Sequence, residues 1–203
     1  TGEDICFIGC PRIPKPASPE YRAHLDHVNK FMMFREIFPE CTGFVYTCDD
    51  IYAVQDFTLE DIIRPKIRTR EIGGSFHDNN AWVRDSFRTK MLLQKKGLPT
   101  LNWVCHLPVY YEWDKLLAIY KNYDCWNRSR VVEHLYFNTY YADSNPIVLE
   151  DGNEPNDYQF KVWNRMCDME KFKEAFGTKI WISNSVDGWR PEMEQELAKY
   201  YGV

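Results

Sequence analysis

Two adjacent aspartates are the residues of this chain that are best placed to do chemistry. Asp49 and Asp50 follow the apolar run 44–47 and Cys48. An apolar strand that stops at two acids presents them at its carboxyl end, where ligands bind in open α/β sheets. Neighbouring carboxylates repel each other, and a divalent cation between them relieves that repulsion. Mg²⁺ and Mn²⁺ prefer such oxygen ligands and bring substrate phosphates with them. The alternative interpretation is a solvated acidic turn that binds nothing.

A histidine among aromatic side chains forms the second candidate site. His106 ends an apolar stretch and precedes Leu107-Pro108, and its imidazole could ligate a metal or contact a phosphate. A strand-end histidine that only makes a structural hydrogen bond explains the same pattern. Trp103 and Tyr110 lie near it in the sequence. Flat rings beside a polar site are natural platforms for sugar rings, although rings in such numbers also fill protein cores.

The charge balance limits the classes of partner. The 203 residues include 25 Lys and Arg against 30 Asp and Glu, a net charge of −5, so the overall basic field that nucleic acid requires is absent. The basic stretch 64–70 could neutralise a diphosphate, but a solvated face explains it better. No apolar run approaches the ~20 residues that a membrane-spanning helix needs. We therefore expect neither a nucleic-acid partner nor a transmembrane segment.

The cysteines indicate the compartment. Seven cysteines without a CxxC pair are typical of free thiols in a reducing cytoplasm, and a chain of this length can bury a core without disulfides. No repeat, charge block or low-complexity linker divides the chain, so we expect one cytoplasmic α/β domain over residues 1–203. The sequence begins with Thr1-Gly2 rather than Met, which is consistent with an N-terminally truncated fragment.

The chain is predicted to alternate between strands and helices, and these elements must position the candidate residues. Apolar runs bounded by Gly and Pro predict strands, and apolar residues at helical spacing between capping residues predict helices. Such alternation predicts an α/β fold with a mostly parallel central sheet and helices on both faces. The elements expected in chain order are a strand at 5–8, a helix from 18 to 39, a strand at 43–47, a helix at 80–96, a strand at 101–106, helices at 112–122 and 129–142, strands at 158–163 and 179–183, and a helix from 190 to 202.

The sequence around the aspartates resembles a known family motif. The stretch 44–51, Phe-Val-Tyr-Thr-Cys-Asp-Asp-Ile, is similar to the aspartate motif of GT-A-type nucleotide-sugar glycosyltransferases. It is closer to the strand end of the Stealth-type capsular sugar-phosphate transferases. The segment 105–108, Cys-His-Leu-Pro, is similar to an H-x-P element downstream in that group. The late strand at 179–183, followed by Asn184 and a helix, also fits it. The resemblance implies a GT-A-like fold, related to the Rossmann fold.

The resemblance also implies a reaction and its residues. It implies transfer of a sugar from a nucleotide-diphosphate donor to a saccharide acceptor, assisted by Mn²⁺ or Mg²⁺. Asp50 would act at the metal–diphosphate centre, Asp49 would help to bind the cofactor, and His106 would join both as a metal ligand. Trp103, His106 and Tyr110 would contact the substrate. Glu133, on the helix at 129–142, would take the proton of the acceptor hydroxyl.

The sequence departs from the family pattern at two places. Cys48 stands where the first acid of the usual D-x-D motif would be, and a thiol does not replace a hard oxygen ligand, so Asp50 is the best-placed metal ligand. Only four residues precede the strand at 5–8. The first strand of the fold is therefore missing from this chain, or the nucleotide pocket is built differently. Two alternatives stay open: transfer of a sugar 1-phosphate in polysaccharide synthesis, and a non-catalytic carbohydrate-binding protein with the same fold.

Overall fold

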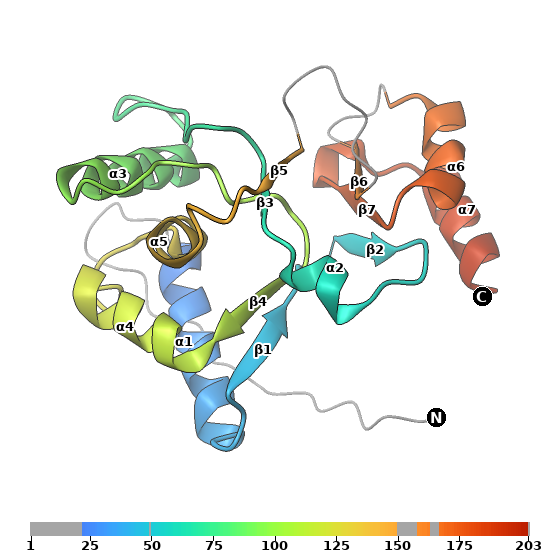
Figure 1. Cartoon of the computed structure of the whole chain (residues 1–203). Coiled ribbons are helices and arrows are strands. Elements are labelled where there is room, and N and C mark those ends of the chain that lie inside the picture. The colour runs from blue at the N-terminus through green and yellow to red at the C-terminus, as the bar shows by residue number, and fades with distance from the viewer. Residues whose placement is uncertain (1–21, 49, 150–157, 163–166, 203) are drawn as a thin grey trace. The chain divides into compact units, whose positions relative to one another are not determined.

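The computed structural model describes residues 22–48, 50–149, 158–162 and 167–202 (Figure 1). The chain divides into two compact units, and each is described by itself. The first unit comprises Thr1–Thr42, Ile72–Thr100 and Glu112–Thr139, and the second comprises Gly43–Glu71, Leu101–Tyr111 and Tyr140–Val203. The strand expected at 5–8 and the expected start of the first helix lie outside the described residues.

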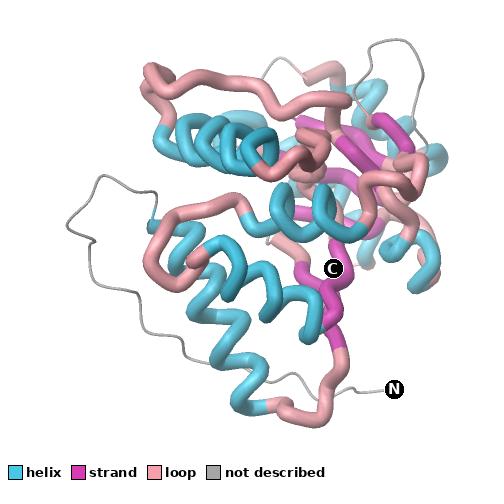
Figure 2. Tube along the Cα trace, turned by 60° about the vertical axis from the view of Figure 1, so that its left-hand side comes forward, coloured by secondary structure: helices cyan, strands magenta, loops and turns pink. Residues whose placement is uncertain are grey.

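The first unit is helical in the part that the structure describes (Figure 2). Asn80 caps α3, because its side-chain oxygen accepts a hydrogen bond of 2.9 Å from the Trp82 amide. Asp124 ends α4 in the left-handed conformation, with φ at 53°. The helices of this unit are α1 (Arg22–Ile37), α3 (Ala81–Lys95), α4 (Trp113–Tyr123) and α5 (Val132–Tyr140).

Aromatic rings of α4 and α5 make up much of the first unit's core. Trp113, Tyr120 and Tyr136 are completely or almost completely buried. The Tyr136 hydroxyl accepts a hydrogen bond of 3.0 Å from the Glu112 amide, which precedes α4. Phe34 of α1 stacks on Trp113 with 6.2 Å between the ring centroids. In this unit the aromatic side chains therefore pack the core.

The second unit contains three small sheets. In the first, β1 (Gly43–Tyr46) lies beside β4 (Val109–Glu112). In the second, β3 (Lys66–Ile67) pairs in parallel with β5 (Ile147–Val148). The third has the order β2-β7-β6. Its strands are β2 (Ile51–Ala53), β6 (Gln159–Val162) and β7 (Trp181–Asn184), and the helices of the unit are α2 (Leu59–Ile63), α6 (Met169–Thr178) and α7 (Pro191–Tyr201).

The three-stranded sheet has two different faces. β2 runs antiparallel to β7, and β6 runs parallel to it. Because side chains alternate along a strand, Tyr52, Ile182 and Val162 share one face. They pack there against Phe172 of α6 and against Met193 and Leu197 of α7. The other face carries Ile51 and Trp181, which pack against Cys105, Leu107 and Leu149.

The expectation of a mostly parallel central sheet with helices on both faces is wrong. The described strands form three separate sheets of two, three and two strands, each strand being two to four residues long. Only β6, α6 and β7 follow the strand–helix–parallel strand order that the alternation predicted. The third strand of this sheet, β2, runs antiparallel to β7. α6 and α7 pack on one face, and Ile62 of α2 packs with the cluster on the other face. The GT-A-like arrangement is therefore absent from the described chain.

Several individual elements are confirmed. The strand expected at 43–47 and the helices expected at 80–96, 112–122, 129–142 and 190–202 are present with slightly different bounds. The strand expected at 101–106 is wrong: this segment contributes one isolated bridge, between Asn102 and Thr69, and His106 has φ at 53°. A residue in the left-handed region cannot continue a strand, so the segment turns at His106. α6 and β2 were not expected.

Candidate functional site

Asp50 lies in the connection between two strands of different sheets. β1 ends at Tyr46 and β2 begins at Ile51, so the acid stands at the start of β2 rather than at the end of β1. The Asn184 amide donates a hydrogen bond of 3.1 Å to the Asp50 carbonyl oxygen. The register pairs Ile51 with Ser183, which places Asp50 opposite Asn184. Side chains opposite each other on antiparallel strands have Cβ atoms about 4.5–5.5 Å apart and share one face.

Two oxygen atoms at this pair of residues lack a partner. Oδ1 of Asp50 and Oδ1 of Asn184 are both buried, and within the described chain neither accepts a hydrogen bond. A buried acceptor without a donor costs about 1–3 kcal/mol. Here two such acceptors stand at opposite strand positions, so each of them adds this free-energy cost at the same end of the sheet. This end of the sheet, called the Asp50–Asn184 pair below, suits a ligand that carries positive charge or donates hydrogen bonds.

The donor set fits a hard divalent cation. Carboxylate and amide oxygens are ligands of Mg²⁺ and Mn²⁺, and Mg²⁺ is often held by one or two protein carboxylates plus substrate phosphates. Among the described residues, no group of three or more His, Cys, Asp and Glu side chains is arranged to hold a metal ion. A cation at the Asp50–Asn184 pair would therefore take its other ligands from a substrate or from water. Asp49, the other predicted ligand, lies outside the described residues.

The backbone of His106 contacts the other face of the sheet from the Asp50–Asn184 pair. The Gln159 side-chain amide donates to the His106 carbonyl oxygen at 2.7 Å and to the Ser183 hydroxyl at 3.0 Å. Gln159 and Ser183 point to the face of Trp181, whereas Asn184 points to the face of Ile182. These contacts place the carbonyl oxygen of His106 on the face opposite the Asp50–Asn184 pair. A shared metal site of His106 and Asp50 stays a prediction.

The remaining predicted residues are spread over both units. Trp103 is buried, with 2% of its surface exposed, which leaves no ring face open to a sugar. Tyr110 of β4 is half-buried and packs closely against Gly43 of β1. Glu133 belongs to the first unit, whereas Asp50 belongs to the second. It stands half-buried in the first turn of α5, where an acid also stabilises the helix dipole.

The basic stretch 64–70 is only in part the solvated face that was expected, because Arg64 and Arg70 are exposed but Lys66 is buried. Lys66 is 8% exposed and donates to the carbonyl oxygens of Asp61 and Arg64. Its ammonium lies 4.9 Å from the ring centroid of Tyr158. Burial lowers the pKa of Lys66 to about 8. This lysine is therefore a structural cation of the second unit, since its donors are used within the chain.

A cavity with three arginines was missed in the sequence. It has a volume of ≈ 340 Å³ and is lined by Phe76, Arg88, Met91, Arg128 and Arg130. All five residues belong to the first unit. Arg128 and Arg130 stand two residues apart in the short connection between α4 and α5, and this spacing was the available signal. Without knowledge of where α3 lies, nothing in the sequence joins them to Arg88.

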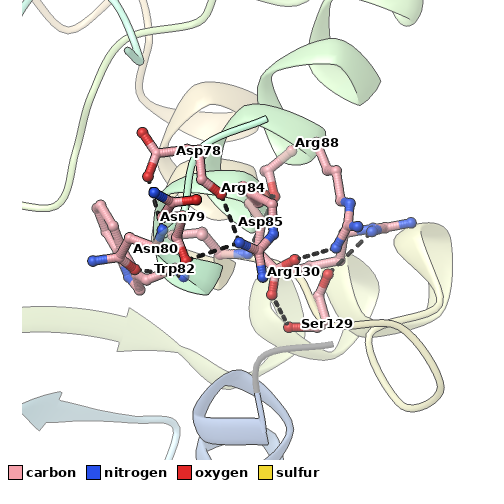
Figure 3. A network of polar contacts seen from close by, with 11 residues as sticks. Asp78, Asn79, Asn80, Trp82, Arg84, Asp85, Arg88, Ser129 and Arg130 are labelled. Atoms are coloured by element: carbon pink, nitrogen blue, oxygen red, sulfur yellow. Dashed lines mark hydrogen bonds and ion pairs between the residues drawn. The ribbon is translucent and has the colours of Figure 1, made fainter. Parts of the chain in front are cut away.

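A buried carboxylate supports the wall of this cavity (Figure 3). Asp85 of α3 is 1% exposed, and its two oxygens accept hydrogen bonds of 2.6 Å each, from Arg88 and from the Ser129 hydroxyl. The Arg130 guanidinium donates to the Ser129 carbonyl oxygen at 3.0 Å. The network therefore links α3 to the α4–α5 connection and orients Arg88, since a buried charge must be paired.

Two histidines are buried near this network. The His134 ring Nε2 and the Ser86 hydroxyl are 2.8 Å apart and both residues are buried. Burial lowers the pKa of His134 to about 3 and that of His24 to about 4, with Asp85 partly opposing the effect on His24. Both imidazoles are therefore neutral at pH 7. Serine and histidine are the residue types of a catalytic nucleophile and its general base. The Ser86–His134 pair is buried, however, so a substrate cannot reach it.

The described helices include none with the length and apolar character needed to cross a membrane. Comparison of the chain with protein-family models, with curated proteins and with solved structures finds no match.

Proposed function

We propose that this chain is a transferase that moves a sugar from a nucleotide-diphosphate donor to a saccharide acceptor, with a divalent cation at the Asp50–Asn184 pair. One observation carries the proposal: Asp50 and Asn184 place two buried oxygens without hydrogen-bond partners at opposite strand positions. Such oxygens are stabilised by a cation, and in transferases of this kind the cation is bound together with a diphosphate.

The chemistry of the reaction explains why the site would need positive charge. Cleavage of the bond between a sugar and a diphosphate leaves negative charge on the departing phosphate. A bound Mg²⁺ or Mn²⁺ would neutralise that charge. The role of the chain's own residues is to hold ligand oxygens in place. Asp50 provides a carboxylate, and Asn184 provides a neutral oxygen from β7, so that only one negative charge is buried at the pair.

The acceptor needs a base. Glu133 stays only a prediction for this role, because it belongs to the first unit and Asp50 belongs to the second. A carboxylate that takes the proton of a saccharide hydroxyl raises the rate typically by about 10²–10⁴-fold. Glu133 is half-buried in the first turn of α5. The proposal of a transferase rests on the Asp50–Asn184 pair and does not depend on this assignment.

A second candidate is a non-catalytic saccharide-binding protein. It is favoured by the lack, among the described residues, of a metal cluster built from three or more His, Cys, Asp and Glu side chains. A binding protein would recognise the saccharide without requiring a cation or a nucleotide. The two candidates therefore differ in what stabilises the folded chain.

Thermal unfolding with added ligands separates these candidates. We expect Mn²⁺ together with UDP, GDP or CDP to raise the melting temperature, because a ligand that binds only the native state stabilises it. Asp50→Asn should abolish the shift. Asp56→Asn is the matched control, since Asp56 is an exposed acid of the same unit and should retain it. The transferase proposal is refuted if no nucleotide shifts the wild-type transition or if Asp50→Asn keeps the full shift.

A further inference from the structure

The arginine cavity is assembled from three segments of the first unit. Arg88 and Met91 stand three residues apart on α3 and so lie on one side of the helix. Arg128 and Arg130 come from the connection between α4 and α5, and Phe76 comes from the segment that precedes α3. The cavity is thus a product of tertiary packing within one unit.

The guanidiniums keep donors that the chain does not use. Nε of Arg130 is buried and has no hydrogen-bond partner within the described chain. Arg128 meets Asp124 at 3.8 Å, and both side chains are more than half exposed, so the attraction is weak. Arg88 is bound to Asp85. Each guanidinium has five N–H groups, and one contact of each is seen within the described part of the chain. Three arginines against two carboxylates leave this cavity positive in a chain whose net charge is −5.

An apolar surface lies beside these charges. Phe76 is 51% exposed, and its ring meets Phe87 of α3 edge-on with 4.8 Å between the centroids. Met91 is 41% exposed. Gly74 helps to set the course of this segment, because its φ of 98° is strained for other residues. A ring and a thioether next to guanidiniums can pack against the apolar face of a sugar while the phosphate is held by charge.

We infer that this cavity binds the phosphate group of a phosphorylated saccharide, with the sugar ring against Phe76. Guanidiniums match phosphate geometry through paired, charge-assisted hydrogen bonds, which are the strongest hydrogen bonds of proteins. The choice of a saccharide as the carrier of the phosphate rests on the proposed function. The phosphate itself follows from the arginines alone. No residue of the Asp50–Asn184 pair takes part, so the inference and the cation site can fail separately.

Calorimetric titration in EDTA tests the inference without a divalent cation. The probes are glucose 1-phosphate, inorganic phosphate and glucose. We expect glucose 1-phosphate to bind more tightly than phosphate, and glucose not to bind at millimolar concentration. Arg128→Gln and Arg130→Gln should each weaken binding of both anions by about ten-fold or more, because each removes a charged donor. Phe76→Ser should remove the advantage of glucose 1-phosphate over phosphate.

A control variant shows whether the effect is specific to the arginines of the cavity. Lys121→Gln removes one positive charge from an exposed position of α4 in the same unit and should leave the affinity unchanged. Arg128 is exposed, so its replacement leaves the fold intact even if Arg130→Gln does not fold. The inference is overturned if neither anion binds, or if Arg128→Gln and Lys121→Gln weaken binding equally. Asp50→Asn should not change these affinities, so a failure of the nucleotide and Mn²⁺ experiment leaves this result standing.

Discussion

Asp50 and Asn184 show how a polar pair at the end of two strands can be specified by backbone pairing. Their main chains are joined by a hydrogen bond, and the antiparallel register sets their side chains side by side. Neither buried Oδ1 atom has a donor within the described residues. A purely structural pair would combine a donor with an acceptor, so two acceptors at this place favour a role in binding a ligand.

Asn184→Asp distinguishes a cation site from a structural polar pair. The substitution puts a second carboxylate opposite Asp50, and the mutual repulsion should lower the free energy of unfolding by about 1–3 kcal/mol in EDTA. Mn²⁺ should restore more stability to this variant than it adds to the wild type, since it neutralises both carboxylates. Chemical denaturation with and without Mn²⁺ measures the difference. Asn145→Asp, at an exposed position of the same unit, is the control. Equal responses of the two variants to Mn²⁺ would contradict a cation site.

At the scale of elements, close backbone approach explains why β1 and β4 can lie together. A Cβ atom on Gly43 would be 2.6 Å from the Tyr111 carbonyl oxygen and 2.3 Å from the Tyr110 hydroxyl. Phe44 and Tyr111 of the same two strands have ring centroids 5.6 Å apart. Glycine at position 43 is therefore required by packing rather than by a left-handed conformation. Tyr110, which was predicted to contact substrate, has a structural part in this pairing.

Gly43→Ala and Gly177→Ala should change stability in opposite directions. At Gly43 the new methyl group meets backbone atoms, and overpacking of this kind costs typically about 1–3 kcal/mol. At Gly177 of α6 nothing lies within 4 Å of the added Cβ, and alanine in a helix is favoured over glycine by about 0.5–1 kcal/mol. Urea denaturation measures both changes. A stabilising Gly43→Ala would show that β1 and β4 are further apart than described.

At the scale of the whole molecule, the two buried histidines link stability to pH. The folded pKa is about 4 for His24 and about 3 for His134, against an ordinary value of 6.5. The unfolded chain therefore binds more protons than the folded chain once the pH falls below 6.5. The contribution of these two histidines to the free energy of unfolding should be complete above that pH. It should decline as the pH falls to about 3, and below that pH these two groups should cause no further change.

His134→Gln should reduce this acid sensitivity. A glutamine can retain a hydrogen bond to Ser86 but does not titrate. The free energy of unfolding of the variant should vary less between pH 6.5 and pH 4 than that of the wild type, even if the variant is less stable at pH 7. Urea denaturation across this range measures it. His77→Gln, at an exposed position of the same unit, should leave the slope unchanged. A wild-type slope that persists in His134→Gln would exclude this histidine as a cause.

Local patterns predicted the elements whose ends carry their own signals. The helix at Ala81–Lys95 has its capping asparagine, and the helix at Pro191–Tyr201 begins with proline and ends at Gly202 in the left-handed conformation. These signals act between residues that are close in the chain, so they can be identified without knowing the fold. The segment 101–106 shows the limit, because its apolar character reflects burial of Trp103 and Cys105 rather than strand pairing.

The sequence by itself determined most of the described helices and the net negative charge, and it led to the prediction that Asp50 binds a ligand. Only the tertiary structure decided which residues meet: it set Asn184 opposite Asp50, joined the His106 backbone to Gln159 and brought Arg88 to Arg128 and Arg130. The physical reason is that capping and periodicity depend on neighbours in the chain. Strand partners and cavity walls, in contrast, depend on contacts between distant segments, whose free energy is shared over many side chains and cannot be assigned to any one local pattern.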